Sequence, residues 1–91
     1  MNAYPYHQAI YTEYRGPTNS HGSRIIVTLR RGVDTIKKTM PYDHSTYYAH
    51  DAAVERALDE TLRKDGDNWQ IIAKGESQNG KGYVYLAEWK S

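Results

Sequence analysis

The sequence predicts an α+β fold, in which an antiparallel β-sheet of about five strands carries one helix on one face, in the order β-β-β-α-β-β. Three observations lead to this fold. The 91 residues are enough for one domain with a single core. Several short segments alternate apolar and polar residues, and one longer segment repeats apolar residues at helical spacing. We expect residues 1–7 to be a flexible lead-in and residues 8–91 to be a single α+β domain.

The first strand is predicted over residues 8–15, where the side chains alternate. Ile10, Thr12 and Tyr14 fall on one face, and Tyr11 and Glu13 fall on the other. Residues 16–23 are glycine, proline, asparagine, histidine and small hydroxyl residues, a composition that favours turns. We expect this segment to be the loop that leads to the second strand.

Residues 24–30 and 33–40 are predicted to form a β-hairpin around a tight turn at Arg31 and Gly32. Pro41 ends the second arm, because proline has no N–H to donate to a sheet. One set of apolar side chains is expected to face the core: Ile25, Val27, Leu29, Ile36 and Met40. The hairpin has a basic tip and outer face, made by Arg30, Arg31, Lys37 and Lys38.

A helix is predicted from Ser45 or Thr46, either of which can cap its N-terminus, to about Asp65. Gly66 follows at the position that favours glycine after a helix. The apolar residues that recur every three or four positions form one buried stripe: Tyr47, Val54, Ala57, Leu58 and Leu62. On the outer face, the i,i+4 spacing of ion pairs occurs twice, at Asp59 with Arg63 and at Glu60 with Lys64.

Two further strands are predicted over residues 69–74 and 83–89. The loop between them contains Asn79 and Gly80, a pair that favours a tight turn. With one helix covering one face of the sheet, the other face lies in water. We expect Tyr83 and Tyr85 to lie on this water-exposed face.

The composition limits the classes of function. The chain has no cysteine, which excludes disulfides, thiol chemistry and cysteine-ligated metal sites. No run approaches the roughly 18 apolar residues of a membrane span. The first residues lack the basic and apolar regions of a secretory signal. We therefore expect a cytoplasmic protein that does not enter a membrane.

No catalytic or metal-binding set can be assembled from the sequence. Asp43 and His44 are adjacent, but no nucleophile is placed beside them by a motif, so we expect a connector between strand and helix. His44 and His50 lie six residues apart, which puts them on no common helical turn, and no HExxH motif is present. The sequence therefore predicts no enzyme activity, no metal site and no cofactor.

The loop of residues 16–23 has two interpretations. Its glycines and hydroxyl residues can direct backbone N–H groups toward one anion, with Arg24 directly after the loop. Alternatively, Thr18, Asn19 and Ser20 bond to their own backbone, as polar turns commonly do. The spacing does not fit a P-loop, which needs a lysine and a following helix. We favour the structural interpretation.

The charges are unevenly distributed along the chain, although the net charge is only +1. Residues 1–38 contain six basic and two acidic residues, and residues 39–91 contain six basic and nine acidic residues. A basic surface with tyrosines is typical of nucleic-acid binding and of protein interfaces, although a pI of about 8.0 is modest for a nucleic-acid-binding protein. The candidate binding residues are Thr18, Asn19, Arg24, Arg30, Arg31, Lys37, Lys38, Tyr83 and Tyr85.

Two sequence blocks resemble a family of small uncharacterised proteins of phages, prophages and plasmids. YRGPTNSHGSRI at residues 14–25 is similar to the family pattern Y-x-G-P-T-N-x-x-G-x-R-I, and PYDH follows at residues 41–44. The family's alanine-rich helix, tryptophan and Gly-Tyr-Val segment are similar here to residues 49–62, Trp69 and residues 82–84. The resemblance covers most of residues 10–87, but residues 30–39 are longer and more basic than the family pattern.

The resemblance implies an accessory protein of a mobile genetic element, acting in the host cell as a binding module. We expect its partner to be a host or phage protein or nucleoprotein complex, and inhibition of a host defence complex such as CRISPR or restriction follows by analogy. The alternative is an accessory protein that binds nucleic acid directly. The sequence does not determine the oligomeric state.

Overall fold

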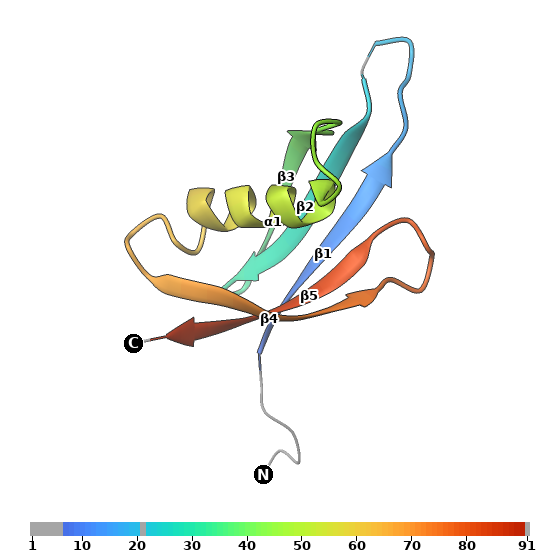
Figure 1. The fold of residues 1–91 in the computed structure, drawn as a ribbon. Helices are drawn as coiled ribbons and strands as arrows, with labels where there is room; N and C mark the ends of the chain where they lie inside the picture. Colours follow the sequence, from blue (N-terminus) through green and yellow to red (C-terminus); the bar gives the residue numbers. More distant parts are fainter. Residues whose placement is uncertain (1–6, 21, 91) are drawn as a thin grey trace.

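The computed structural model describes residues 7–20 and 22–90. It confirms the α+β class and the order of elements: β1 (Gln8–Arg15), β2 (Arg24–Arg31), β3 (Asp34–Pro41), α1 (Ala49–Glu60), β4 (Asn68–Glu76) and β5 (Tyr83–Lys90) (Figure 1). Except for His7, the lead-in predicted over residues 1–7 lies outside the described residues. No helix in the described part of the chain has the length and apolarity needed to cross a membrane.

The five strands form one antiparallel sheet in the order β3-β2-β1-β5-β4. The first strand is therefore central, and β3 and β4 are the two edges. The β1–β2–β3 segment and the β4–β5 hairpin join where β1 pairs with β5, with Gln8 opposite Ala87 and Tyr11 opposite Val84. Figure 1 shows α1 lying across one face of this sheet.

The core lies between α1 and the sheet face that it covers. Alternation along the strands brings one apolar set to this face, and the three-to-four spacing of α1 supplies the other. The buried apolar residues are Ile10, Ile25, Val27, Leu29, Met40, Ala49, Ala53, Val54, Ala57, Leu58, Tyr85 and Ala87. The predicted core positions on β2, together with Met40, are confirmed, and Ile36 and Leu62 pack against this core as partly buried residues.

The predicted start of the helix at Ser45 or Thr46 is wrong, because both residues stabilise turns before α1. Asp43 accepts hydrogen bonds from the backbone N–H (2.9 Å) and the hydroxyl (2.5 Å) of Ser45. Thr46 Oγ1 accepts one from the Tyr48 N–H at 3.1 Å. Short polar side chains bonded in this way compete with helix formation. Tyr47, predicted in the buried stripe, therefore precedes α1 and is fully exposed.

The predicted end of the helix at Asp65 is also wrong, because α1 stops five residues earlier. The hydroxyl of Thr61 donates to the Ala57 carbonyl at 2.6 Å, and the chain continues through a series of turns. Gly66 closes these turns with a φ of 89° and an N–H that donates to the Arg63 carbonyl at 3.0 Å. The left-handed glycine predicted here is thus present, but it follows the turns rather than the helix itself.

One of the two predicted ion pairs of the helix forms. Arg63 lies 3.2 Å from Asp59, as the spacing predicts. Glu60 pairs with Arg56 at 3.2 Å rather than with Lys64. Glu60 thus has Arg56 and Lys38 as its partners, and Lys64 lies in the turns that follow α1.

The strand boundaries differ little from the predicted ones. The turn between β2 and β3 is made by Gly32, with a φ of 62°, and Val33, one residue later than predicted. On the edge strand β4, the register shifts between Ile71 and Ala73, which marks a β-bulge. Bulges at sheet edges bend the strand and interrupt further pairing.

Candidate functional site

No described element covers the sheet face opposite α1, which we call the open sheet face (Figure 1). Its side chains alternate along each strand with those of the core. Tyr11 is 52% exposed and lies on the central strand, opposite Thr28 of β2 and Val84 of β5. The half-buried Ile26 and Leu86 extend this group into an apolar stripe.

Basic side chains flank the apolar stripe on β1, β2 and β3. Arg15 pairs with Glu13 at 2.7 Å. Within residues 7–20 and 22–90, Arg24, Arg30 and Lys37 form no ion pair, and a buried guanidinium nitrogen of Arg24 has no hydrogen-bond partner. Arg30 and Lys37 are exposed. The charges of Arg30 and Lys37 are therefore available to acidic groups of another molecule.

The four cations of the predicted basic hairpin do not form a single patch. Because side chains alternate along β2 and β3, Arg30 and Lys37 lie on the open sheet face, and Arg31 and Lys38 lie on the face that carries α1. Arg31 lies 3.6 Å from Asp65, in the turns after α1, and Lys38 lies 3.8 Å from Glu60 of α1. Two of the four cations thus form ion pairs within the fold, and the other two lie on the open sheet face.

The predicted placement of Tyr83 and Tyr85 on the water-exposed face is wrong. Both lie on the face that carries α1, and Tyr85 is only 2% exposed. Its hydroxyl donates to Asp51 of α1 at 2.5 Å, and Lys74 of β4 donates to the same oxygen at 2.7 Å. Tyr83 and Tyr85 share one face of β5, as the alternation predicts, but the sequence does not tell which face of the strand contacts the helix.

These contacts determine the ionisation of Asp51 and Tyr85. Burial alone would raise the pKa of Asp51, but the hydrogen bonds from Lys74 and Tyr85 outweigh it, so the pKa of this carboxyl is lowered. Burial and the neighbouring Asp51 charge raise the pKa of the Tyr85 hydroxyl. Asp51 is therefore an anion and Tyr85 a neutral donor at neutral pH. Lys74 also lies over the ring of Tyr83, 4.1 Å from its centroid.

The predicted loop residues Thr18 and Asn19 are exposed, in the loop that projects between β1 and β2 (Figure 1). This loop and the Arg30 region lie at opposite ends of β2. Gly16 and Gly22 do not have the left-handed φ that glycines adopt elsewhere in this chain. The loop therefore does not belong to the same surface as Arg30 and Lys37.

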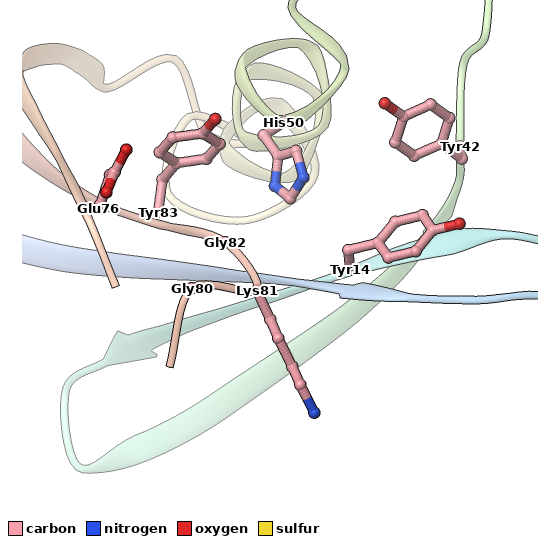
Figure 2. A pocket seen from close by; sticks show the side chains of 8 residues that line it. All are labelled: Tyr14, Tyr42, His50, Glu76, Gly80, Lys81, Gly82 and Tyr83. Atoms are coloured by element: carbon pink, nitrogen blue, oxygen red, sulfur yellow. The ribbon is translucent and has the colours of Figure 1, made fainter. Parts of the chain in front are cut away.

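A second surface lies on the side of the sheet that carries α1, and we call it the tyrosine cleft (Figure 2). It has a volume of about 460 Å³. The residues that line it come from the end of β1, the connector before α1, α1 itself and the β4–β5 hairpin: Tyr14, Tyr42, His50, Glu76, Gly80, Lys81, Gly82 and Tyr83. Figure 2 shows Tyr83 and His50 on one side, Tyr14 and Tyr42 on the other, and the glycine-containing segment between them.

The rings of the cleft form two perpendicular pairs. Tyr14 and Tyr42 have centroids 5.5 Å apart at 86°, and His50 and Tyr83 have centroids 5.0 Å apart at 81°. The Tyr14 hydroxyl shares a hydrogen bond with the hydroxyl of Ser23 at 3.1 Å. These contacts hold the rings in fixed orientations.

A contact with Thr12 fixes the position of the His50 ring. Its Nδ1 lies 2.8 Å from Thr12 Oγ1, which also accepts the N–H of Tyr83 at 3.0 Å. Burial and the positive charge of Lys74 lower the pKa of His50, against an opposing effect of Asp51. The imidazole is therefore neutral at neutral pH.

Sequence reasoning missed the tyrosine cleft. It considered His50 only as a metal ligand, and it assigned no role to Tyr42. Two signals were present in the sequence: Tyr14 shares a face with Thr12, and Gly82 directly precedes Tyr83. The contacts that join these residues span 38 and 71 positions of sequence, which local patterns do not reveal.

The described residues contain no group of three or more histidine, aspartate and glutamate side chains arranged to hold a metal ion. The adjacent Asp43 and His44 do not form an acid–imidazole pair. Asp43 bonds to Ser45, and the ring of His44 packs against Tyr42 with centroids 4.7 Å apart. The hydrogen bonds from Ser45 also lower the pKa of Asp43.

Comparison with protein-family models gives no match, and searches of curated proteins and of solved structures find no similar protein either.

Proposed function

We propose that this protein is a binding module that acts by contact rather than catalysis, and that the open sheet face contacts an acidic surface of a protein partner. The observation that supports this proposal is the organisation of that face. An apolar stripe with the half-exposed Tyr11 runs across the sheet, and beside it lie Arg30 and Lys37, cations without an ion pair in the part of the chain that the structure describes. Protein interfaces have this organisation, with an apolar centre, a polar rim, and tyrosine and arginine as preferred residues.

The resemblance to phage and plasmid proteins supports a more specific proposal. In it, the partner is a host or phage protein or a nucleoprotein complex, and the binding module belongs to a mobile genetic element. Blocking a host defence complex, such as a CRISPR or restriction complex, is one outcome of such contact. This step rests on analogy with small accessory proteins of the same origin.

Direct binding of nucleic acid is the second candidate function, and the position of Tyr11 favours it. An exposed ring among cations can stack on a base while the cations contact phosphates. Such binding weakens steeply with salt, because phosphate contacts release counterions.

A pair of matched charge reversals tests the proposed surface. Arg30→Glu with Lys37→Glu reverses the two cations of the open sheet face. Arg31→Glu with Lys38→Glu reverses their immediate neighbours on the opposite face. Cross-linking and affinity capture from a host lysate identify partner proteins, and association rates with the purified partner are then compared. We expect the first double variant to associate severalfold more slowly at low salt, since opposed charges mainly raise the association rate.

The second double variant is the control, and we expect it to associate like the parent protein, with a small loss of stability from its two surface ion pairs. Equal rates for the parent and the Arg30 and Lys37 variant would rule out the open sheet face as the interface. Fluorescence anisotropy with a labelled oligothymidylate and a labelled duplex, at low and at physiological salt, tests the second candidate. Salt-sensitive binding that the first double variant loses would favour nucleic acid as the partner.

A further inference from the structure

We propose that the tyrosine cleft binds a cationic head group, a guanidinium or a methylated ammonium, carried by a side chain of a partner polypeptide. This site lies on the other side of the sheet from the open sheet face and has the opposite electrostatic preference. It therefore goes beyond the function proposed above and does not depend on it.

The arrangement of rings is the first argument. Three tyrosines and a neutral imidazole line one open cleft of about 460 Å³. They form two perpendicular pairs, which Figure 2 shows on opposite sides of the cleft. Aromatic faces carry negative quadrupole charge, and several rings at right angles around one space are the arrangement that receives methylated ammonium groups.

The charges around the cleft are the second argument. Glu76 contributes a carboxylate to the lining, and within the described residues it forms no ion pair. Figure 2 shows the side chain of Lys81 directed away from the rings, toward the other side of β1. The positive charge of Lys74 lies nearby, but Asp51 pairs with it at 2.7 Å. Glu76 is therefore the lining side chain whose charge attracts a cation, whereas Lys74 acts against positive charge at His50 more strongly than Asp51 favours it.

The molecule already contains a cation on one of these rings. The ammonium of Lys74 lies 4.1 Å from the ring centroid of Tyr83 and 5.6 Å from that of Tyr85. Both distances are within the roughly 6 Å over which a ring attracts a cation. The tyrosines of this part of the sheet thus accept an ammonium group in the protein's own structure.

Glycine allows the two sides of the cleft to lie close together. Gly82 lies so close to Thr12 that a Cβ at this position would overlap the Thr12 backbone. The Lys81 carbonyl accepts the Tyr14 N–H at 2.8 Å. These two contacts hold the β4–β5 hairpin against β1, and so they fix the distance between the Tyr83 side and the Tyr14 side of the cleft.

The test uses small probes and NMR on the intact protein. The probes are the N-acetyl amides of trimethyllysine and of arginine, and choline represents a free quaternary ammonium. The neutral control is the analogue of trimethyllysine in which carbon replaces the charged nitrogen. We expect the methyl protons of trimethyllysine to shift upfield and the ring protons of Tyr14, Tyr42 and His50 to shift with them. We expect the neutral analogue to bind about tenfold more weakly or not at all.

Substitutions test whether the probes bind in the tyrosine cleft. Glu76→Gln removes an exposed carboxylate without affecting the core, and we expect it to weaken trimethyllysine binding severalfold. Asp67→Asn, an exposed carboxylate outside the cleft, is its control and should bind like the parent. Tyr42→Leu should abolish binding, and Tyr47→Leu, which removes a fully exposed ring outside the cleft, should not.

The outcomes separate the alternatives. Binding of trimethyllysine or arginine, with loss in the Glu76→Gln and Tyr42→Leu variants, supports the proposal. Choline binding more tightly than either amide would identify a free ammonium compound instead of a side chain. Equal binding of the neutral analogue, or no shifts with any probe, would overturn the proposal.

Discussion

At the scale of single residues, Thr12 joins His50 of α1 to Tyr83 of β5. Its hydroxyl has one proton, and two groups lie within reach of it. The Tyr83 carbonyl is 3.5 Å away, at the limit of a hydrogen bond, and His50 Nδ1 is 2.8 Å away. The hydroxyl accepts the Tyr83 N–H and shares a hydrogen bond with His50 Nδ1, in which the donor depends on the tautomer of the imidazole.

This geometry predicts how stability depends on pH. The pKa of His50 is lowered from 6.5, chiefly by burial, so the unfolded chain binds a proton that the folded protein does not bind. The stability from neutral His50 is therefore present above pH 6.5 and is lost as the pH falls through 6.5 toward the folded pKa. We expect His50→Asn, which keeps an acceptor near Nδ1, to flatten the fall in unfolding free energy through this window. Urea unfolding at a series of pH values measures the unfolding free energy of the parent and of the variant.

Asp51 provides an internal reference for that experiment. Its pKa is lowered from 3.8, so its contribution is lost only as the pH falls below 3.8. The two effects therefore occur in separate windows. A His50→Asn variant with the same pH dependence as the parent between neutral pH and pH 5 would contradict the assignment to His50.

At the scale of elements, the entry into β5 constrains the sheet most tightly. Gly82 is buried against β1, and its carbonyl accepts the N–H of Ser77 at 3.1 Å, which closes the β4–β5 hairpin. A side chain at this position would overlap the Thr12 carbonyl and lie in tight contact with the Thr12 hydroxyl oxygen. The close approach is possible only because glycine has no Cβ.

We expect Gly82→Ala to lower the free energy of unfolding by about 3 kcal/mol or more, because two backbones would have to separate. Gly75→Ala is the matched control, since a Cβ at Gly75 meets no atom within 4 Å. In a strand, alanine replaces glycine with no loss or a small gain of stability. Thermal and chemical unfolding compare the two variants, and similar stabilities would show that the hairpin can move away from β1.

At the scale of the whole molecule, the single helix creates two different surfaces. One helix covers only part of one face of a five-stranded sheet, so the other face stays open and carries Arg30 and Lys37, which form no ion pair within the described residues. On the covered side, the helix and its connector bring His50 and Tyr42 beside the tyrosines of β1 and β5. The sheet itself separates a basic surface from the aromatic cleft for which we propose a cationic ligand.

This separation predicts that the two sites act independently. We expect Arg30→Glu with Lys37→Glu to leave trimethyllysine binding unchanged, and Glu76→Gln to leave the association of an acidic partner unchanged. Titration of each variant with both ligands measures the two affinities. Additive effects are expected for sites without shared contacts, and a loss of both affinities in either variant would contradict two independent sites.

The sequence alone determined the class of fold and the order of its elements. Period-two alternation identified the strands, and the bounds of β1 agree with the prediction residue for residue. The three-to-four spacing identified the helix, and the core residues Val54, Ala57 and Leu58 are those of the predicted stripe. These features are local, because each depends on a side chain's position relative to near neighbours in sequence.

Only the tertiary structure decided what each face does. Alternation shows that Tyr83 and Tyr85 share a face, but the packing of α1 on that face decided that Tyr85 is buried. Alternation places Arg30 and Arg31 on opposite faces, but the same packing decided that Arg31 is the one that lies near Asp65. The helix ends also lay beyond sequence reasoning, since Thr46 and Thr61 each had a competing backbone partner. Local patterns set the geometry of a segment, whereas burial and charge pairing depend on residues far away in the chain that only folding brings into contact.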